Sequence, residues 1–195
     1  MVAVSNPFGL RCVYHPSGLA RARTALTDGI ASGFGSAILL GQPIRFTPNQ
    51  GTIAPITTNS QDWLGVFDGV EWTDTTGRRR VNNSWISGTT FIAGTCRAYF
   101  IEDPDAVYEI QSDATMAQTT IYNQVNFTTA NLAAGSTTPG ISQATAAATA
   151  VGSGVQGQMR VLDRGPQVNN AWGDAFVILR VQNAQSQQRA NKVAI

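Results

Sequence analysis

The segment from Leu64 to Gln111 constrains the fold most, because its residues alternate as they do in antiparallel β-strands. Its first apolar run has a single parity and is predicted to face one core; it comprises Leu64, Val66, Val70 and Trp72. Asp68-Gly69 interrupts this face, which indicates a β-bulge. A turn at Asp74–Gly77 then leads into a strand that carries Arg78–Val81 outward. The segment has no His and no Lys, which is more typical of a binding surface than of a catalytic one.

Short strand signals continue on both sides of this segment. The same reasoning predicts strands at Ala37–Leu40, Ile44–Phe46, Gly51–Ile56, Cys96–Ile101, Val107–Gln111, Met159–Leu162 and Ala175–Val181. Cys96–Ile101 and Ala175–Val181 are nearly all apolar, so we expect both to be central in their sheets. The only helix candidate is 114–127, where Asp113 is a potential cap and Ala117, Ile121 and Val125 fall at i, i+4 and i+8.

The pattern predicts an all-β chain, folded as a single β-barrel or sandwich of short antiparallel strands with at most one short helix. Residues 1–32 are expected to form an extended N-terminal arm with at most a short strand near Arg11–Tyr14. The β-barrel domain would span residues 33–181 and include a Gly/Ala/Thr-rich excursion at about 128–157, interpreted as a long loop. The polar, Gln-rich residues 182–195 are expected to form a C-terminal arm.

Composition excludes several classes of function. The net charge is +1 and only 13% of residues are charged, so no basic stripe exists for direct nucleic-acid binding. No apolar run reaches the ~18 residues of a membrane span, and Met1–Leu10 lacks the pattern of a signal peptide. Cys12 and Cys96 form no CxxC pair, which favours two free thiols and a reducing compartment.

Few residues offer chemistry. His15 is the single histidine and lies in the predicted arm, and a strand there would put Cys12 and His15 on opposite faces. Glu102, Asp103 and Asp105 cluster at a turn; paired acids can hydrolyse glycosides and carboxylates can bind Ca²⁺, but a solvated turn explains them more simply. We therefore assign no catalytic residue, no cofactor and no metal site.

Two further motifs have competing interpretations. Residues 152–157 match the G-x-G-x-x-G fingerprint, but the strand–helix context that a dinucleotide site needs is missing. Asp68, Glu71 and Asp74 face Arg78–Arg80 across the predicted hairpin, which predicts cross-strand ion pairs. The Arg triplet is interpreted either as a protein interface or as a charged strand edge that prevents aggregation.

Over half of the chain resembles the capsid decoration, or cement, proteins of tailed bacteriophages. The resemblance rests on an ordered set of strand and turn residues: Gly41-Gln42-Pro43-Ile44, Leu64–Val70, Thr73-Asp74 with Gly77, Ala98-Tyr99 with Glu102-Asp103-Pro104, Val107–Gln111, and Asn170-Ala171-Trp172-Gly173. The chain departs from the family pattern in its longer, Arg-bearing N-terminal stretch and in the Ala/Thr-rich residues near 141–150.

The resemblance implies a virion structural protein, made in the host bacterial cytoplasm, that binds the outer surface of the assembled capsid. Its implied partners are the major capsid protein, whose subunits it bridges, and copies of itself, with a trimer favoured. We expect the contact residues to be Arg11, Tyr14, Arg21, Arg23, Arg78, Arg79 and Arg80. The alternatives are a carbohydrate-binding or adhesin module that uses Trp63, Trp72, Trp85 or Trp172 as stacking platforms, and a hydrolase that uses the Glu102–Asp105 turn.

Overall fold

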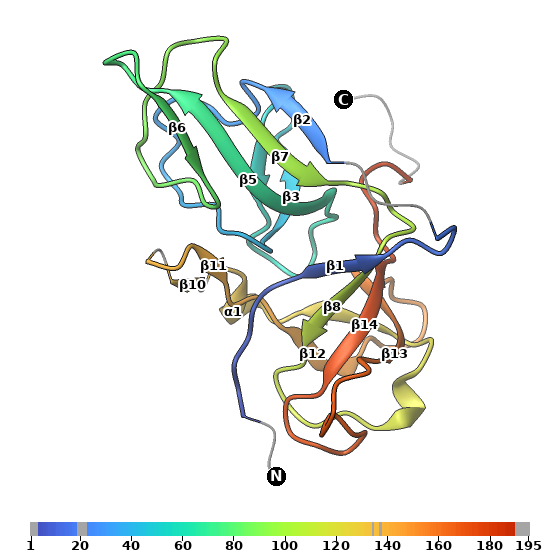
Figure 1. The fold of residues 1–195 in the computed structure, drawn as a ribbon. Coiled ribbons are helices and arrows are strands. Elements are labelled where there is room, and N and C mark those ends of the chain that lie inside the picture. The colour runs from blue at the N-terminus through green and yellow to red at the C-terminus, as the bar shows by residue number, and fades with distance from the viewer. Residues whose placement is uncertain (1–3, 19–22, 134, 137, 190–195) are drawn as a thin grey trace.

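The computed structural model describes residues 4–18, 23–133, 135–136 and 138–189, and it is all-β, as predicted. Two antiparallel sheets form two lobes that lie one above the other in Figure 1. The lower lobe holds the sheet with strand order β1 (Arg11–Tyr14), β8 (Val107–Gln111), β14 (Ile178–Asn183), β13 (Met159–Arg164), β9 (Gln124–Phe127) and β12 (Ala146–Ala150).

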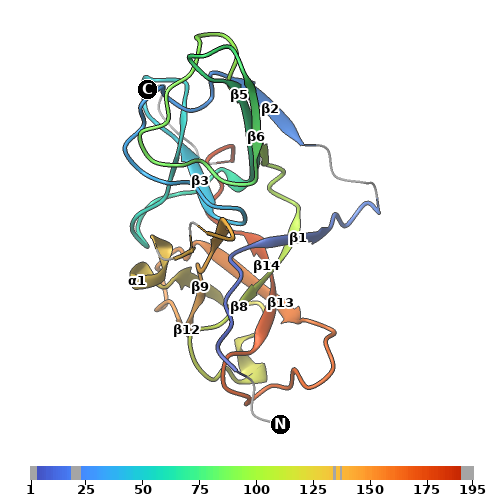
Figure 2. The ribbon, with the colours of Figure 1, turned by 60° about the vertical axis from the view of Figure 1, so that its left-hand side comes forward.

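The upper lobe holds the second sheet. Its order is β2 (Thr24–Thr27), β7 (Arg97–Ile101), β5 (Gly65–Thr73), β3 (Pro43–Phe46) and β4 (Ile53–Pro55), with β6 (Arg79–Asn82) also paired to β5. The remaining elements are small: a 3₁₀ turn η1 (Gln118–Thr120), a helix α1 (Thr129–Leu132) and the two-residue strands β10 (Gly135–Ser136) and β11 (Ile141–Ser142). Figures 1 and 2 both place β1 at the boundary between the lobes.

The two open sheets correct the barrel alternative, since neither sheet closes within the described residues. The lower sheet curls, and an isolated bridge between Ser112 and Ala146 ties the end of β8 to β12. Each lobe has its own core. Trp63, Tyr108 and Phe127 pack together in the lower core, and Phe67, Trp85 and Phe100 are fully buried in the upper core.

The bulge predicted at Asp68-Gly69 is confirmed, because the register between β5 and β7 shifts between Phe67 and Gly69. The predicted single core face is wrong in one position. Val66 packs in the lower core, whereas Leu64, Val70 and Trp72 pack in the upper core. Val66 is the second residue of β5 and faces the lower core, so Phe67 faces the upper core, and the bulge returns Val70 to the same side as Phe67.

The predicted helix at 114–127 is wrong. Only η1 is helical in this stretch, and β9 occupies its last four residues, where it pairs with β12 and β13. Asp113 caps no helix; its carboxylate accepts hydrogen bonds from the Thr128 hydroxyl (2.7 Å) and the Ala148 N–H (2.9 Å). The Val125 side chain is fully buried in the lower core. β-branched residues such as Val125 and the neighbouring threonines favour this strand over a helix.

The segment expected to be a long loop at 128–157 contains α1, β10, β11 and β12; β12 joins the lower sheet, and β10 and β11 pair in a separate two-stranded sheet. The strand predicted near Arg11–Tyr14 is confirmed as β1, while β2 in the same N-terminal stretch was not predicted. This stretch thus gives one edge strand to each sheet.

The strand predicted at Ala175–Val181 is β14. It is central in its sheet, as predicted, but begins at Ile178 and ends at Asn183. After β14, the Gln187 side-chain amide accepts a hydrogen bond from the Phe46 N–H (2.7 Å) and donates one to the Phe46 carbonyl (3.3 Å).

Candidate protein-contact surfaces

Asp74 organises the hairpin that joins β5 to β6 at the far end of the upper lobe (Figure 1). Its Oδ1 accepts hydrogen bonds from the Thr76 hydroxyl (2.6 Å) and from the N–H groups of Thr76 and Arg78 (3.0 Å each). Its Oδ2 accepts a bond from Arg80 Nε at 2.8 Å. These bonds, above all those from Thr76, Arg78 and Arg80, hold the pKa of Asp74 well below its usual range. The carboxylate therefore fixes both the turn and one guanidinium of the Arg triplet.

Glu71 holds the second guanidinium. Arg79 Nη2 donates to Glu71 Oε2, and this bond, followed by one from Tyr99, lowers the pKa of Glu71. The same contact with Glu71 raises the pKa of the Tyr99 phenol. The predicted cross-strand pairs are thus confirmed for Glu71 and Asp74, but Asp68 lies against Arg23 instead.

β6 is an edge strand. Within the described residues it pairs only with β5, so its outer backbone N–H and C=O groups have no neighbouring strand. Val81 is 72% exposed on it. Arg78 precedes the strand, is exposed, and forms no ion pair in the described part of the chain. We call Arg78–Asn82 the hairpin surface. It combines an unpaired edge, an apolar side chain and three guanidinium groups, which suits contact with another protein.

Glu109 organises a second cluster on β1, β8 and β14. This carboxylate is 2% exposed, and it accepts hydrogen bonds from Arg11 Nη2 (2.5 Å) and Gln167 Nε2 (2.9 Å). Arg180 Nε lies 3.7 Å from its other oxygen, and the Tyr14 ring lies 5.6 Å from the Arg180 guanidinium carbon. Arg11 and Tyr14 therefore fasten β1 to its sheet while parts of both side chains stay exposed.

A groove of about 320 Å³ runs beside β1 at the boundary between the lobes. Two charged residues, Arg11 and Asp68, line the groove. The rest of its lining is mostly apolar and includes Phe8, Leu10, Leu40, Val66, Phe67 and Ile141. Arg23 Nε forms an ion pair with Asp68. We call Arg11, Tyr14, Arg23 and this groove the boundary surface. Arg21 lies outside the described residues. The other predicted contact residues lie on two separate surfaces: Arg78, Arg79 and Arg80 on the hairpin surface, and Arg11, Tyr14 and Arg23 on the boundary surface.

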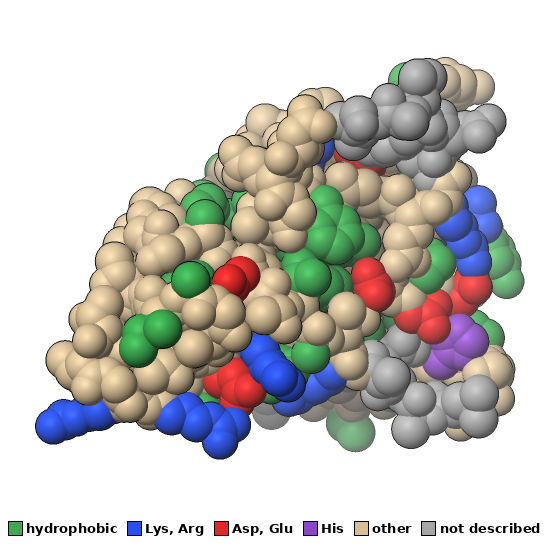
Figure 3. All heavy atoms as spheres, turned by 90° about the horizontal axis from the view of Figure 1, so that it is seen from above, with side chains coloured by type: hydrophobic (Ala, Val, Ile, Leu, Met, Phe, Trp, Pro, Cys, Tyr) green, Lys and Arg blue, Asp and Glu red, His purple; other side chains and the backbone are tan. Residues whose placement is uncertain are grey.

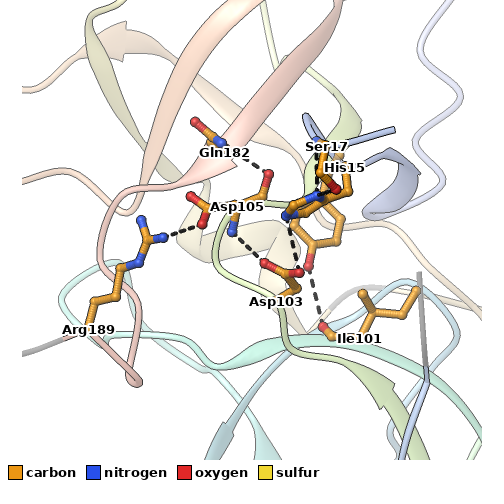
Figure 4. A network of polar contacts seen from close by, with 8 residues as sticks. His15, Ser17, Ile101, Asp103, Asp105, Gln182 and Arg189 are labelled. Carbon is orange, nitrogen blue, oxygen red and sulfur yellow. Dashed lines mark hydrogen bonds and ion pairs between the residues drawn. The ribbon is translucent and has the colours of Figure 1, made fainter. Parts of the chain in front are cut away.

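A third cluster joins the single histidine to the acidic turn between β7 and β8 (Figure 4). His15 Nε2 lies 3.3 Å from Asp103 Oδ2, and Ser17 contacts His15 Nδ1 through its N–H (3.1 Å) and its hydroxyl oxygen (2.5 Å). Asp105 forms an ion pair with Arg189. Seen from above, the histidine lies among acidic side chains on the surface (Figure 3). Sequence reasoning missed this cluster, because His15 is close to Asp103 only through the pairing of β1 with β8.

The other candidate motifs lie elsewhere. Trp63, Trp72 and Trp85 are buried in the two cores, which removes them as sugar-stacking platforms, and Trp172 is half-buried. Glu102 accepts a bond from the Thr24 hydroxyl (2.7 Å) and is separate from the histidine cluster. Residues 152–157 lie between the strands β12 and β13, so they lack the strand–helix context of a dinucleotide site. Cys12 and Cys96 form no disulfide, and burial raises the pKa of the Cys96 thiol to about 11.

Comparisons with family models, curated proteins and solved structures find no match to this chain. Among the described residues, no helix has the length and apolar character needed to cross a bilayer.

Proposed function

We propose that this chain is a virion structural protein that binds the outer surface of an assembled phage capsid and bridges neighbouring copies of the major capsid protein. The hairpin surface carries the proposal: an edge strand with an exposed Val81 and arginines that Glu71 and Asp74 hold in place. The sequence resemblance to phage decoration proteins and the all-β fold support it. In this proposal the chain acts as a homo-oligomer, with a trimer favoured.

Two separate contact surfaces suit a bridging protein. The hairpin surface lies at the far end of the upper lobe, and the boundary surface lies between the lobes (Figure 1). One copy can therefore touch two capsid subunits at once. A protein that binds only the assembled lattice stabilises that lattice by mass action, and repetition over the shell adds avidity. Guanidinium groups already held in position lose less conformational freedom on docking.

Co-sedimentation of the purified chain with expanded heads and with precursor shells tests this proposal. We expect binding to expanded heads only, and a higher temperature of DNA release from heads that carry the chain. Arg78→Glu should weaken binding at least tenfold, because it reverses an exposed charge within the proposed contact. Arg160→Glu is the matched control, since it makes the same charge change on an exposed position of β13, away from both surfaces.

Two results would overturn the proposal. Equal binding to expanded and precursor shells would show that the assembled lattice is not what the chain recognises. Equal heat resistance of heads with and without the bound chain would remove the stabilising role. If Arg78→Glu and Arg160→Glu weaken binding equally, the hairpin surface is not the contact.

A further inference from the structure

His15, Asp103 and Asp105 place three metal-ligating side chains together from two distant segments of the chain. One atom from each, an imidazole nitrogen or a carboxylate oxygen, lies within 4.8 Å of the other two. His15 follows β1, and the two aspartates form the turn between β7 and β8 (Figure 4). Within the turn, the Asp105 N–H donates to Asp103 Oδ1 at 2.8 Å. This bond leaves Asp103 Oδ2 directed toward the imidazole.

The His15 ring directs Nε2 toward Asp103 Oδ2, which lies 3.3 Å away. Ser17 contacts Nδ1 with both its N–H and its hydroxyl, so Nε2 is the nitrogen that faces Asp103. Because the Ser17 N–H donates to Nδ1, the neutral ring carries its proton on Nε2, the nitrogen that faces Asp103. When a metal occupies Nε2, the proton must move to Nδ1, so the Ser17 N–H has to turn away and leave the Ser17 hydroxyl oxygen as the acceptor of Nδ1–H. The imidazole stays neutral in this exchange, as a ligand must.

We propose that His15, Asp103 and Asp105 bind one divalent first-row transition-metal ion, with Zn²⁺ as the best match. Two ligands of a tetrahedral Zn²⁺ are separated by ~3.4 Å when the metal–ligand distances are ~2.1 Å, and His15 Nε2 lies 3.3 Å from Asp103 Oδ2. A mixed nitrogen and oxygen set favours Zn²⁺ over Ca²⁺ and Mg²⁺, which prefer oxygen ligands alone. Three protein ligands leave a fourth position for water or for a group from another protein.

Arg189 competes with the ion. Its guanidinium pairs with Asp105 Oδ2, and both side chains are about half exposed, at 56% and 45%. Binding of the ion requires a small rotation of Asp105 away from Arg189 toward His15. The bound ion would link the end of β1 to the β7–β8 turn. This inference does not rest on the proposed function, because binding is measured on the isolated chain.

Calorimetric titration of the full, metal-free chain with Zn²⁺ tests the proposal. We expect one Zn²⁺ per chain, and at least tenfold weaker binding for His15→Ala and for Asp103→Asn. Arg189→Gln should tighten binding several-fold, because it releases Asp105 for the ion. Asp163→Asn, an exposed acid on β13, and Cys12→Ser should leave the affinity unchanged. Thermal melting of the metal-free variants shows that each is folded before titration.

Titration with Co²⁺ gives a second readout, because its visible absorbance reports nitrogen and oxygen ligation and should vanish in His15→Ala. The proposal is wrong if the chain binds no Zn²⁺, or if His15→Ala binds it as tightly as the unaltered chain. It is equally wrong if Cys12→Ser abolishes binding, since the site would then be a thiolate site.

Discussion

Four exposed arginines, Arg11, Arg23, Arg79 and Arg80, each lie against a carboxylate. Their side chains are 51–72% exposed, and solvent screens such ion pairs, so they contribute little to stability. Their larger effect is on conformation, because each carboxylate restricts the rotamers of a long side chain. A surface built from such residues is ordered before a partner arrives.

The pH dependence of stability should carry a contribution from Asp74, whose folded-state pKa is lowered mainly by hydrogen bonds from Thr76, Arg78 and Arg80. In the unfolded chain this carboxyl titrates near ~3.9, so on acidification the unfolded state binds the proton first. The stabilisation is fully present above about pH 5 and is lost as the pH falls below ~4. Asp74→Asn should therefore melt at a lower temperature than the unaltered chain at pH 7, and the gap should narrow as the pH falls toward 2.5.

Asp163→Asn is the control for this melting series, because no ion pair within the described residues involves Asp163. A gap between Asp74→Asn and the unaltered chain that stays constant from pH 7 to pH 2.5 would contradict the assigned cause.

The Asp74 and Glu71 pairs could be predicted from the sequence, because a short hairpin fixes which residues face each other. The His15 cluster could not, because its members meet only through the pairing of β1 with β8 and the turn that precedes β8.

At the scale of elements, alternation identified most strands, and the bulge in β5 followed from a single Asp-Gly pair. The helix prediction at 114–127 failed because apolar residues at i, i+4 and i+8 also share one face of a strand. The neighbouring strands decide between a helix and a strand here. β9 pairs with β12 on one side and with β13 on the other, and the hydrogen bonds between these strands satisfy the backbone groups of β9. Sequence spacing alone does not show such partners.

Gly65 in β5 lies close against the backbone at the end of β7. A Cβ built there would lie 2.0 Å from the Ile101 carbonyl oxygen and 2.8 Å from Glu102 Cα, both backbone atoms. Gly65→Ala must therefore push the strands apart at the boundary between the lobes, and we expect a loss of at least ~2 kcal/mol in the free energy of unfolding. Gly152→Ala is the matched control, since a Cβ there meets nothing within 4 Å. Urea denaturation distinguishes them, and equal midpoints for the two variants would contradict the packing argument.

At the scale of the molecule, the chain crosses between the lobes several times. β1 belongs to the lower sheet and β2 to the upper one, and the β7–β8 turn crosses back. Trp63 directly precedes the upper-core residue Leu64 but lies in the lower core, where it packs against Tyr108 and Phe127 at centroid distances of 5.6 and 5.4 Å. Its Nε1 donates to the Gln158 carbonyl at 2.9 Å. These crossings couple the two cores.

Trp63→Ala should therefore destabilise both lobes, although its cavity lies in the lower one. Removal of a fully buried Trp costs about 3–5 kcal/mol, and cooperative unfolding carries that loss to the upper core. Cys96 reports on the upper core, because its thiol is fully buried there. In a Cys12→Ser background, Trp63→Ala should speed the labelling of Cys96 by a thiol reagent, and the logarithm of the rate should rise in proportion to the fall in unfolding free energy. If the urea midpoint of the lower lobe falls while the labelling of Cys96 stays unchanged, the two lobes unfold independently and the coupling through Trp63 is wrong.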